Sequence, residues 1–354
     1  MSLGDKTDTL IRHFEIQPVA RRAFMISSNT QSVFNARGDY TSSRIDIFKE
    51  RIASVESLLG MGNLCIYATG SYGRLEATEF SDLDLFFIQD PDSPGGKIGK
   101  IEKTLIDADV IRLARKEGFP EFSRDGEFLH IHQMAEILGT LGGQEDDFKN
   151  CFTARMLLLL ESRCLYRQSV YEQMLIKIIN SYYRDYHDHE NEFLPAFLAN
   201  DIVRFWKTLC LNYEHRRNRP AEDPDKKAKS QVKNLKLKFS RLMTSYSTLV
   251  WLAAQPVGPA PENVLEMVMM SPVRRLEAVG SSNQSVETLV AEALDEYAWF
   301  LQTMNQPEDK VLEWFADKGV RDDAFGRGRL FGQKIFELMT ALSAQKPFLR
   351  YLLV

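Results

Sequence analysis

The sequence of 354 residues has little cysteine and no long apolar segment. Its four cysteines, Cys65, Cys151, Cys164 and Cys210, are scattered and form no CxxC pair. This spacing excludes a disulfide framework and is typical of small buried residues in a reducing compartment. No run approaches the ~20 apolar residues that a membrane-spanning helix needs. The first residues also lack the basic and apolar regions of a signal peptide. We therefore expect a cytoplasmic protein without a membrane segment.

The composition is that of a globular protein with one unusually basic segment. Apolar residues make up 44% of the chain and charged residues 26%, which excludes a largely disordered chain. The net charge is −5, yet twelve Lys or Arg residues and only four acids lie between Arg204 and Arg241. A basic segment in an acidic chain suggests a ligand that carries phosphate rather than general nucleic-acid affinity. The alternative is a solvated helical surface.

The first part of the chain has the pattern of an α/β unit. Helical spacing covers residues 43–60 and 97–117, and apolar strand patterns cover 63–69, 83–88 and 127–132. From about residue 146 onward the patterns are helical. The expected helices there lie at residues 153–166, 170–186, 193–217, 229–254, 285–305, 308–318 and 328–345. Proline-rich loops are expected at 218–228 and 255–263.

These patterns predict an α+β fold in which a small mixed-sheet head precedes an all-helical C-terminal body. The expected segments are a head at 1–145, a helical domain at 146–254 that closes over the head, and a C-terminal helical region at 255–354. About two domains are also what the chain length favours. The role of the last segment is open: it is a helical buttress or a docking surface.

One short stretch carries residues suited to phosphate chemistry. The first strand ends at a small Gly70-Ser71 turn, Arg74 follows, and Asp82 and Asp84 open the next strand. Strand alternation places both aspartates on one face. Two carboxylates ~7 Å apart along a strand suit hard divalent cations. The turn offers backbone N–H groups and a hydroxyl with little side-chain bulk. A metal–triphosphate site is therefore predicted.

This stretch, GSYGR followed by SDLDL, resembles the signature of the polymerase-β-like nucleotidyltransferase superfamily. Within it the residues are most similar to the PII-uridylyltransferase group. The resemblance implies that Asp82 and Asp84 ligate Mg²⁺ or Mn²⁺ and that Gly70, Ser71 and Arg74 bind the nucleoside triphosphate. It is confined mainly to residues 64–90, and the chain has no room for the phosphohydrolase and sensing modules of that group. We therefore expect a stand-alone relative.

The third strand departs from the pattern that the resemblance implies. Members of that superfamily place a third carboxylate there, which ligates metal and helps to deprotonate the acceptor hydroxyl. Here the strand contains Glu127, His130 and His132. If Leu129 and Ile131 face the core, the two histidines face the cleft, and neutral imidazole can accept a proton near pH 7. In the opposite phase Glu127 faces the cleft. A third alternative is that all three are ordinary polar strand residues.

The basic segment supplies a second set of candidate phosphate ligands. At ~100° per residue, Lys236 and Ser240 lie together beside the apolar stripe of the helix over 229–254, and Lys238 and Arg241 lie on the opposite side. A lysine with a hydroxyl one turn later suits a triphosphate tail. The resemblance also implies that Lys236 and Ser240 hold the outer phosphates, because many members of that superfamily use a lysine followed by a serine for this purpose. Tyr213 and Tyr246 are candidates to stack on the base; otherwise they are core residues.

The predicted activity is transfer of a nucleoside monophosphate from a triphosphate to an acceptor hydroxyl, with release of pyrophosphate. The resemblance favours a hydroxyl on a protein partner. The alternatives are a small-molecule or second-messenger acceptor and a catalytically silent nucleotide-binding regulator. Nucleic acid is not favoured as a partner, because the chain is acidic and its basic segment is short.

Overall fold

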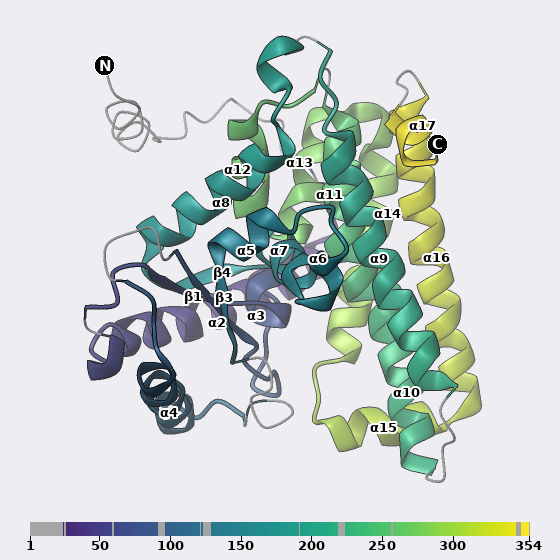
Figure 1. Cartoon of the computed structure of the whole chain (residues 1–354). Helices are drawn as coiled ribbons and strands as arrows, with labels where there is room; N and C mark the ends of the chain where they lie inside the picture. Colours follow the sequence, from purple (N-terminus) through teal and green to yellow (C-terminus); the bar gives the residue numbers. More distant parts are fainter. Residues whose placement is uncertain are drawn as a thin grey trace.

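A small sheet flanked by helices stands beside a larger helical body (Figure 1). The computed structural model describes residues 24, 26–58, 60–90, 96–120, 122, 129–190, 192–218, 224–255, 258–344 and 348–353. The strands are β1 (Leu64–Ala68), β2 (Leu85–Gln89), β3 (Ile131–Gln133) and β4 (Arg163–Tyr166). Their order is β3-β2-β1-β4; β1 runs antiparallel to both β2 and β4, and β2 runs parallel to β3. The expected α+β class with a small mixed sheet is confirmed.

The helices divide between these two regions. Those around the sheet are α2 (Ser28–Ile52), α3 (Gly70–Arg74), α4 (Lys100–Lys116), α5 (Met134–Gly139), α6 (Glu145–Phe148), α7 (Cys151–Leu160) and α8 (Gln168–Tyr182). The body contains α9 (Ala196–Arg217), α10 (Pro224–Lys236), a π-helical turn (Leu237–Arg241), α11 (Leu242–Ala254), α12 (Pro261–Met269), α13 (Pro272–Ser282), α14 (Glu287–Thr303), α15 (Glu308–Ala316), α16 (Lys318–Ser343) and α17 (Phe348–Leu353). Among the described residues, no helix is long and apolar enough to cross a membrane.

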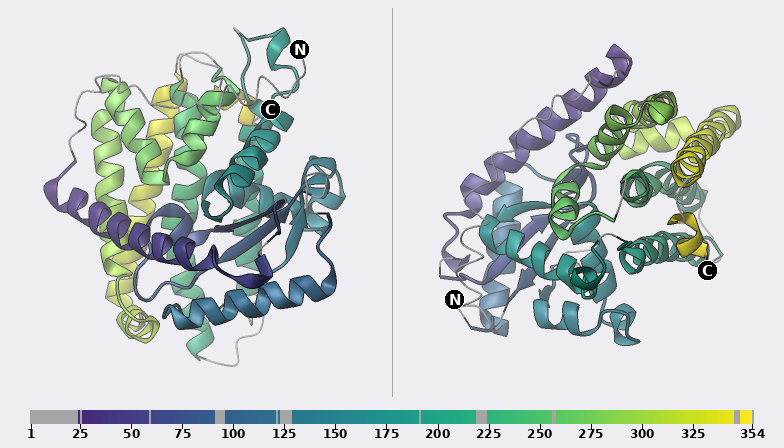
Figure 2. Two further views of the ribbon diagram at one scale, coloured as in Figure 1. Left: turned by 90° about the vertical axis from the view of Figure 1, so that its left-hand side faces the viewer. Right: turned by 90° about the horizontal axis from the view of Figure 1, so that it is seen from above.

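Helices cover both faces of the sheet, so every residue of β1 and β2 is buried and all but Gln89 are apolar. Ile66 and Phe87 point to the face that packs on α2 and α4. Their neighbours Tyr67 and Phe86 point to the face that packs on α7 and α8. Figure 2 shows α2 running across the sheet region towards the helical body. The site described below lies where β1 ends and β2 begins, so two buried strands hold it in place.

Of the two apolar cores, the one on the α7–α8 face of the sheet extends into the helical body. It contains Tyr67 of the sheet, Leu159 of α7, Leu294 of α14 and Leu338 of α16. These residues come from all three segments that the sequence predicted. The C-terminal region therefore packs into the same core as the sheet, and α14 also packs along α2.

The largest difference from the sequence prediction is at residues 153–166. We expected one helix there, but α7 ends at Leu160 and residues 163–166 form β4. β4 pairs with β1 through Ala68 and Arg163, a long-range contact that overrides the local helical pattern. The expected loop at 255–263 contains the start of α12 at Pro261, where proline is well placed in the first turn. No helix was predicted where α13 forms.

Candidate active site

The turn after β1 and the residues before β2 are in direct contact. Gly70 has a φ of +64°, which favours glycine, and a Cβ there would lie 2.8 Å from Oδ2 of Asp84. The Thr69 amide also donates a 2.9 Å hydrogen bond to the Asp84 carbonyl. A side chain at position 70 would therefore displace the Asp84 carboxylate. The predicted pairing of a small turn with an acid is present in the structure.

The two aspartates lie on the same side of the chain, as strand alternation predicted. Leu83 lies between the two aspartates and Leu85 follows them, and both leucines are buried in the core under α2 and α4. Asp82 is exposed and Asp84 is partly exposed. Burial and the neighbouring Asp82 raise the pKa of Asp84 from 3.8 to about 6. Two carboxylates that repel each other in a crowded site are stabilised by a bound cation.

The residues of this site supply part of the coordination that a hard cation needs. Asp82 and Asp84 supply carboxylate oxygens, which are the ligands that Mg²⁺ prefers, and Mg²⁺ commonly takes one or two carboxylates plus phosphate oxygens. Among the described residues no group of three His, Cys, Asp or Glu side chains is placed to hold a metal. The site therefore fits a cation that the substrate and water help to coordinate.

The register of β3 decides which of its polar residues face the aspartates. Leu129 and Ile131 belong to the core under α2 and α4, whereas His132 pairs with Ile88 and stacks on Phe86. His132 therefore lies on the sheet face that Asp84 shares. His130 is exposed, and its ring lies 4.9 Å from that of His132. Both histidines thus lie on the face turned away from α2 and α4, but the register places His132 beside Ile88, four residues along β2 from Asp84. Glu127, the third candidate, lies outside the described residues.

The two histidines differ in their environment. Burial, together with the neighbouring His130, lowers the pKa of His132 from 6.5 to about 4. His132 is therefore neutral at pH 7 and is shielded from solvent at 6% exposure. His130, in contrast, is exposed.

Arg74 occupies a position that differs from our expectation. We predicted a contact with nucleotide phosphate, but its guanidinium is 7% exposed and lies in an internal ion network. Nε donates to Glu76 at 2.7 Å, and Nη1 donates to Glu161 at 2.6 Å. Arg74 therefore holds the end of α3 to Glu76 and Glu161, and it acts on Asp84 electrostatically.

Glu161 is the centre of that network and was not predicted from the sequence. Its carboxylate is buried and accepts hydrogen bonds from Arg74, from Arg241 at 2.6 Å and from Thr244 at 2.7 Å. Burial alone would raise the pKa of Glu161, but Arg241 and Arg74 outweigh it and lower the pKa to about 2. A Cβ at Gly73 would lie 2.0 Å from the Glu161 carbonyl oxygen, so α3 packs directly on the end of α7.

The helical body contributes two cations that face the aspartates. Arg241 bonds Glu161 and interacts electrostatically with Asp84, and its side chain remains 36% exposed. Lys236 is exposed, and its amine interacts with Asp82. Surrounding protein atoms lower the pKa of Lys236, and Asp82 offsets part of that effect. Positive side chains of the body thus meet the carboxylates of the head.

The π-helical turn explains why Arg241 was placed on the wrong side from the sequence. Its i→i+5 bonding inserts one residue, which rotates the following residues by about 100°. Ser240, predicted to bind phosphate, is buried and donates its hydroxyl to the Lys236 carbonyl at 3.0 Å. For Glu161, the available signal in the sequence was its position directly after the apolar run Leu157–Leu160, because an acid buried there needs a buried cation.

Comparisons with protein-family models, with curated proteins and with solved structures found no match to this chain.

Proposed function

We propose that this protein is a metal-dependent nucleotidyltransferase that moves a nucleoside monophosphate from a triphosphate to an acceptor hydroxyl. The observation that supports this function is the convergence of opposite charges from two regions of the fold. Asp82 and Asp84 lie beside the Gly70-Ser71 turn, and Lys236 and Arg241 face them from the helical body. A triphosphate with its metal ion needs both sets of charges.

Each of these side chains has a separate role in the proposed reaction. Asp82 and Asp84 would hold the metal, and Lys236 and Arg241 would bind the outer phosphates. When bound, Mg²⁺ neutralises the phosphate charge and polarises the reacting phosphorus centre. The Ser71 hydroxyl makes no hydrogen bond with the described residues and is half-buried beside Gly70, so it is available to a phosphate oxygen.

The reaction is a substitution at the α-phosphorus. The acceptor oxygen forms a new bond to that phosphorus, and the bond to the pyrophosphate oxygen breaks. The acceptor proton goes to a base, for which His130 is the accessible candidate in the described part of β3 and the residues before it. The resemblance of the motif favours a protein hydroxyl as acceptor, with a small-molecule alcohol as the alternative.

A pyrophosphate-release assay tests the activity. The protein is incubated with ATP, GTP, CTP or UTP, with Mg²⁺ or Mn²⁺, and with or without candidate acceptors. A label on the γ-phosphate follows the released pyrophosphate, and in parallel reactions a label on the α-phosphate identifies the acceptor. The variant Asp82→Asn is expected to lose metal-dependent pyrophosphate release while keeping its circular dichroism spectrum. Asp46→Asn on the exposed side of α2 is the matched control and should behave as the unmodified protein. Turnover by the Asp82 variant at the normal rate would refute the assignment.

A silent nucleotide-binding regulator is the second candidate, because no third acidic or histidine ligand joins the two aspartates among the described residues. Calorimetry separates the two functions. Metal-dependent triphosphate binding without pyrophosphate release, across the four nucleotides, would favour the regulator. In either case Lys236→Met is expected to weaken binding about tenfold. Lys227→Met, an exposed lysine on the other side of α10, should leave it unchanged.

A further inference from the structure

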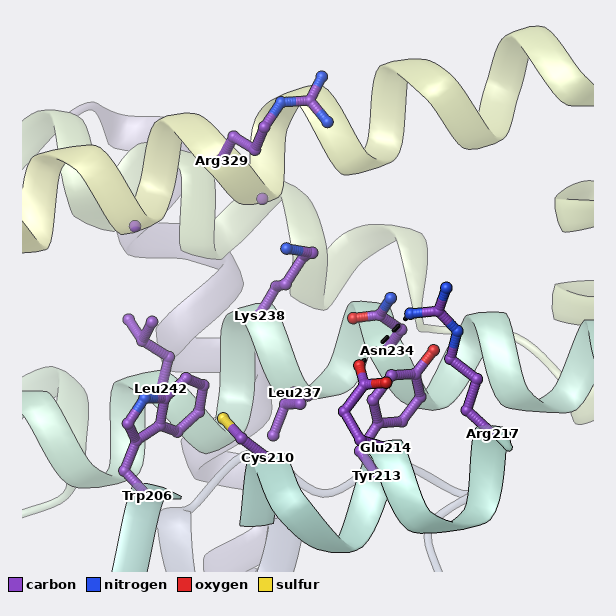
Figure 3. Close-up of a pocket in the computed structure, with 12 residues that line it drawn as sticks. Trp206, Cys210, Tyr213, Glu214, Arg217, Asn234, Leu237, Lys238, Leu242 and Arg329 are labelled. Atoms are coloured by element: carbon purple, nitrogen blue, oxygen red, sulfur yellow. Dashed lines mark hydrogen bonds and ion pairs between the residues drawn. The ribbon is translucent and has the colours of Figure 1, made fainter. Parts of the chain in front are cut away.

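A second concave site lies in the helical body, between α9, the turn after α10, and α16. It is an open pocket with a volume of about 450 Å³ (Figure 3). Its lining residues do not include Asp82, Asp84 or Lys236. Leu237, Lys238 and Leu242 face it from the helix whose other side carries Lys236 and Arg241. The pocket is therefore separate from the candidate active site, on the opposite side of one helix.

Aromatic and apolar groups form one wall of this pocket. Trp206 and Tyr213 come from α9, and Figure 3 shows Leu237 between them. On the opposite wall, Gly328 and Gly332 of α16 contribute only backbone, on either side of Arg329. A Cβ at Gly328 would lie 3.2 Å from Cδ of Lys238, so glycine at this position lets the lysine stem pass close to α16. The space suits a flat ring system.

The charges that line the pocket are not balanced. Arg217 pairs with Glu214 at 3.3 Å. In contrast, the Lys238 ammonium and the Arg329 guanidinium make no hydrogen bond or ion pair with any residue that the structure describes. Lys238 extends from its helix towards α16, where Arg329 lies (Figure 3). Two cations without an acidic partner, next to aromatic rings, provide attraction for an anion.

We propose that this pocket binds a small aromatic anion, with its ring against Trp206 and Tyr213 and its acidic group on Lys238. The ring removes apolar surface from water, and the acid supplies the charge partner that Lys238 lacks. A neutral molecule of the same shape fills the same space but forms no such ion pair. Preference for the anion over its neutral analogue is therefore the property that distinguishes this site from an ordinary surface hollow.

Cys210 provides a reporter inside the pocket. All four cysteines lie within the described residues; Cys65, Cys151 and Cys164 are buried, and only Cys210 is partly exposed. Alkylation of the folded protein with iodoacetamide, located by peptide mass, thus measures access to the pocket. Burial raises the pKa of the Cys210 thiol, and Lys238 lowers it. For this reason the quantity to compare is the ratio of labelling rates with and without a probe, within each variant.

The probes are 2-naphthoate and the neutral alcohol 2-naphthalenemethanol. We expect naphthoate to protect Cys210 at a concentration about tenfold lower than the alcohol requires. Lys238→Met should remove this difference, and Arg329→Met should reduce it. Lys233→Met, on an exposed part of α10 outside the pocket, is the control and should preserve it.

Several outcomes would overturn the proposal. One is equal protection by the two probes in the unmodified protein, which needs no variant to be interpreted. Another is no protection by either probe at millimolar concentration. A third is an anion preference that persists in the Lys238 variant. The labelling uses no nucleotide, so its result is independent of the transferase activity proposed above.

Discussion

The sharpest quantitative prediction concerns Glu161, which joins the Gly-Ser turn to the helical body. We consider the substitution Glu161→Gln, which keeps the shape of the side chain and removes its charge. The buried carboxylate has a pKa of about 2 in the folded protein against an ordinary value of 4.5. A difference of this size corresponds to about 3 kcal/mol of stabilisation at neutral pH. Breaking a buried ion pair costs a similar amount, about 3–5 kcal/mol.

The pH dependence of this effect has a definite sign. Because the pKa of Glu161 is lowered on folding, its contribution is fully present above pH 4.5 and is lost as the pH falls from 4.5 towards 2. The gap in free energy of unfolding between the unmodified protein and the variant should therefore be about 3 kcal/mol at pH 7. This difference in free energy of unfolding should narrow steadily as the pH falls below 4.5, the ordinary pKa of a glutamate.

Urea unfolding followed by circular dichroism measures both quantities. Glu313→Gln is the control, because Glu313 pairs with Lys310 at 2.8 Å on the surface, where its side chain is 73% exposed. Loss of that pair should change the free energy of unfolding by less than about 1 kcal/mol. A change of less than about 1 kcal/mol for Glu161→Gln at pH 7, or a gap that does not narrow in acid, would show that Glu161 is not the charge centre described above.

Three further predictions concern the candidate active site. Gly70→Ala should lower the free energy of unfolding by about 1–2 kcal/mol in urea, because alanine disfavours a φ of +64° and its Cβ meets Asp84; unchanged stability would contradict the contact. Asp84→Asn should raise stability by about 1 kcal/mol at pH 8 without added metal. Because folding raises the pKa of Asp84 from 3.8 to about 6, its charge opposes folding increasingly between these pH values and fully above them, so the gain should vanish below pH 3.8. In NMR titrations, the His132 ring signals should stay constant from about pH 6 to pH 8, because its pKa lies near 4; a midpoint within that range would mean that the ring is not buried as described.

Local patterns in the sequence predicted much of the sheet region. The run Leu64–Ala68 and the turn residues after it are sufficient to predict a buried strand that ends before Gly70. Alternation of Leu83 and Leu85 with the two aspartates predicted which way the acids point, and the burial of both leucines agrees with it. Helix α4 was also predicted within a few residues of its observed bounds. Each of these inferences depends only on neighbours along the chain.

The ion network at the site depends on contacts that no local pattern encodes. Arg74 meets Glu161, which lies 87 residues further along the chain, and Glu161 meets Arg241 from a third element. β4 formed where a helix was expected because β1 offered it a partner strand. The π-helical turn rotated Arg241 towards the acids, although uniform α-helical spacing placed it on the other side.

The sequence by itself determined the types of groups available: two aspartates, a glycine turn and a basic helix, each recognisable from spacing of a few residues. Only the tertiary structure decided which charges pair with one another inside the protein and which remain available to a ligand. The physical reason is that a buried charge requires a partner of opposite sign, and that partner is found by packing of distant elements. Arg74 and Arg241 are both arginines near one carboxylate, yet only the fold buries the first and leaves the second partly open to solvent.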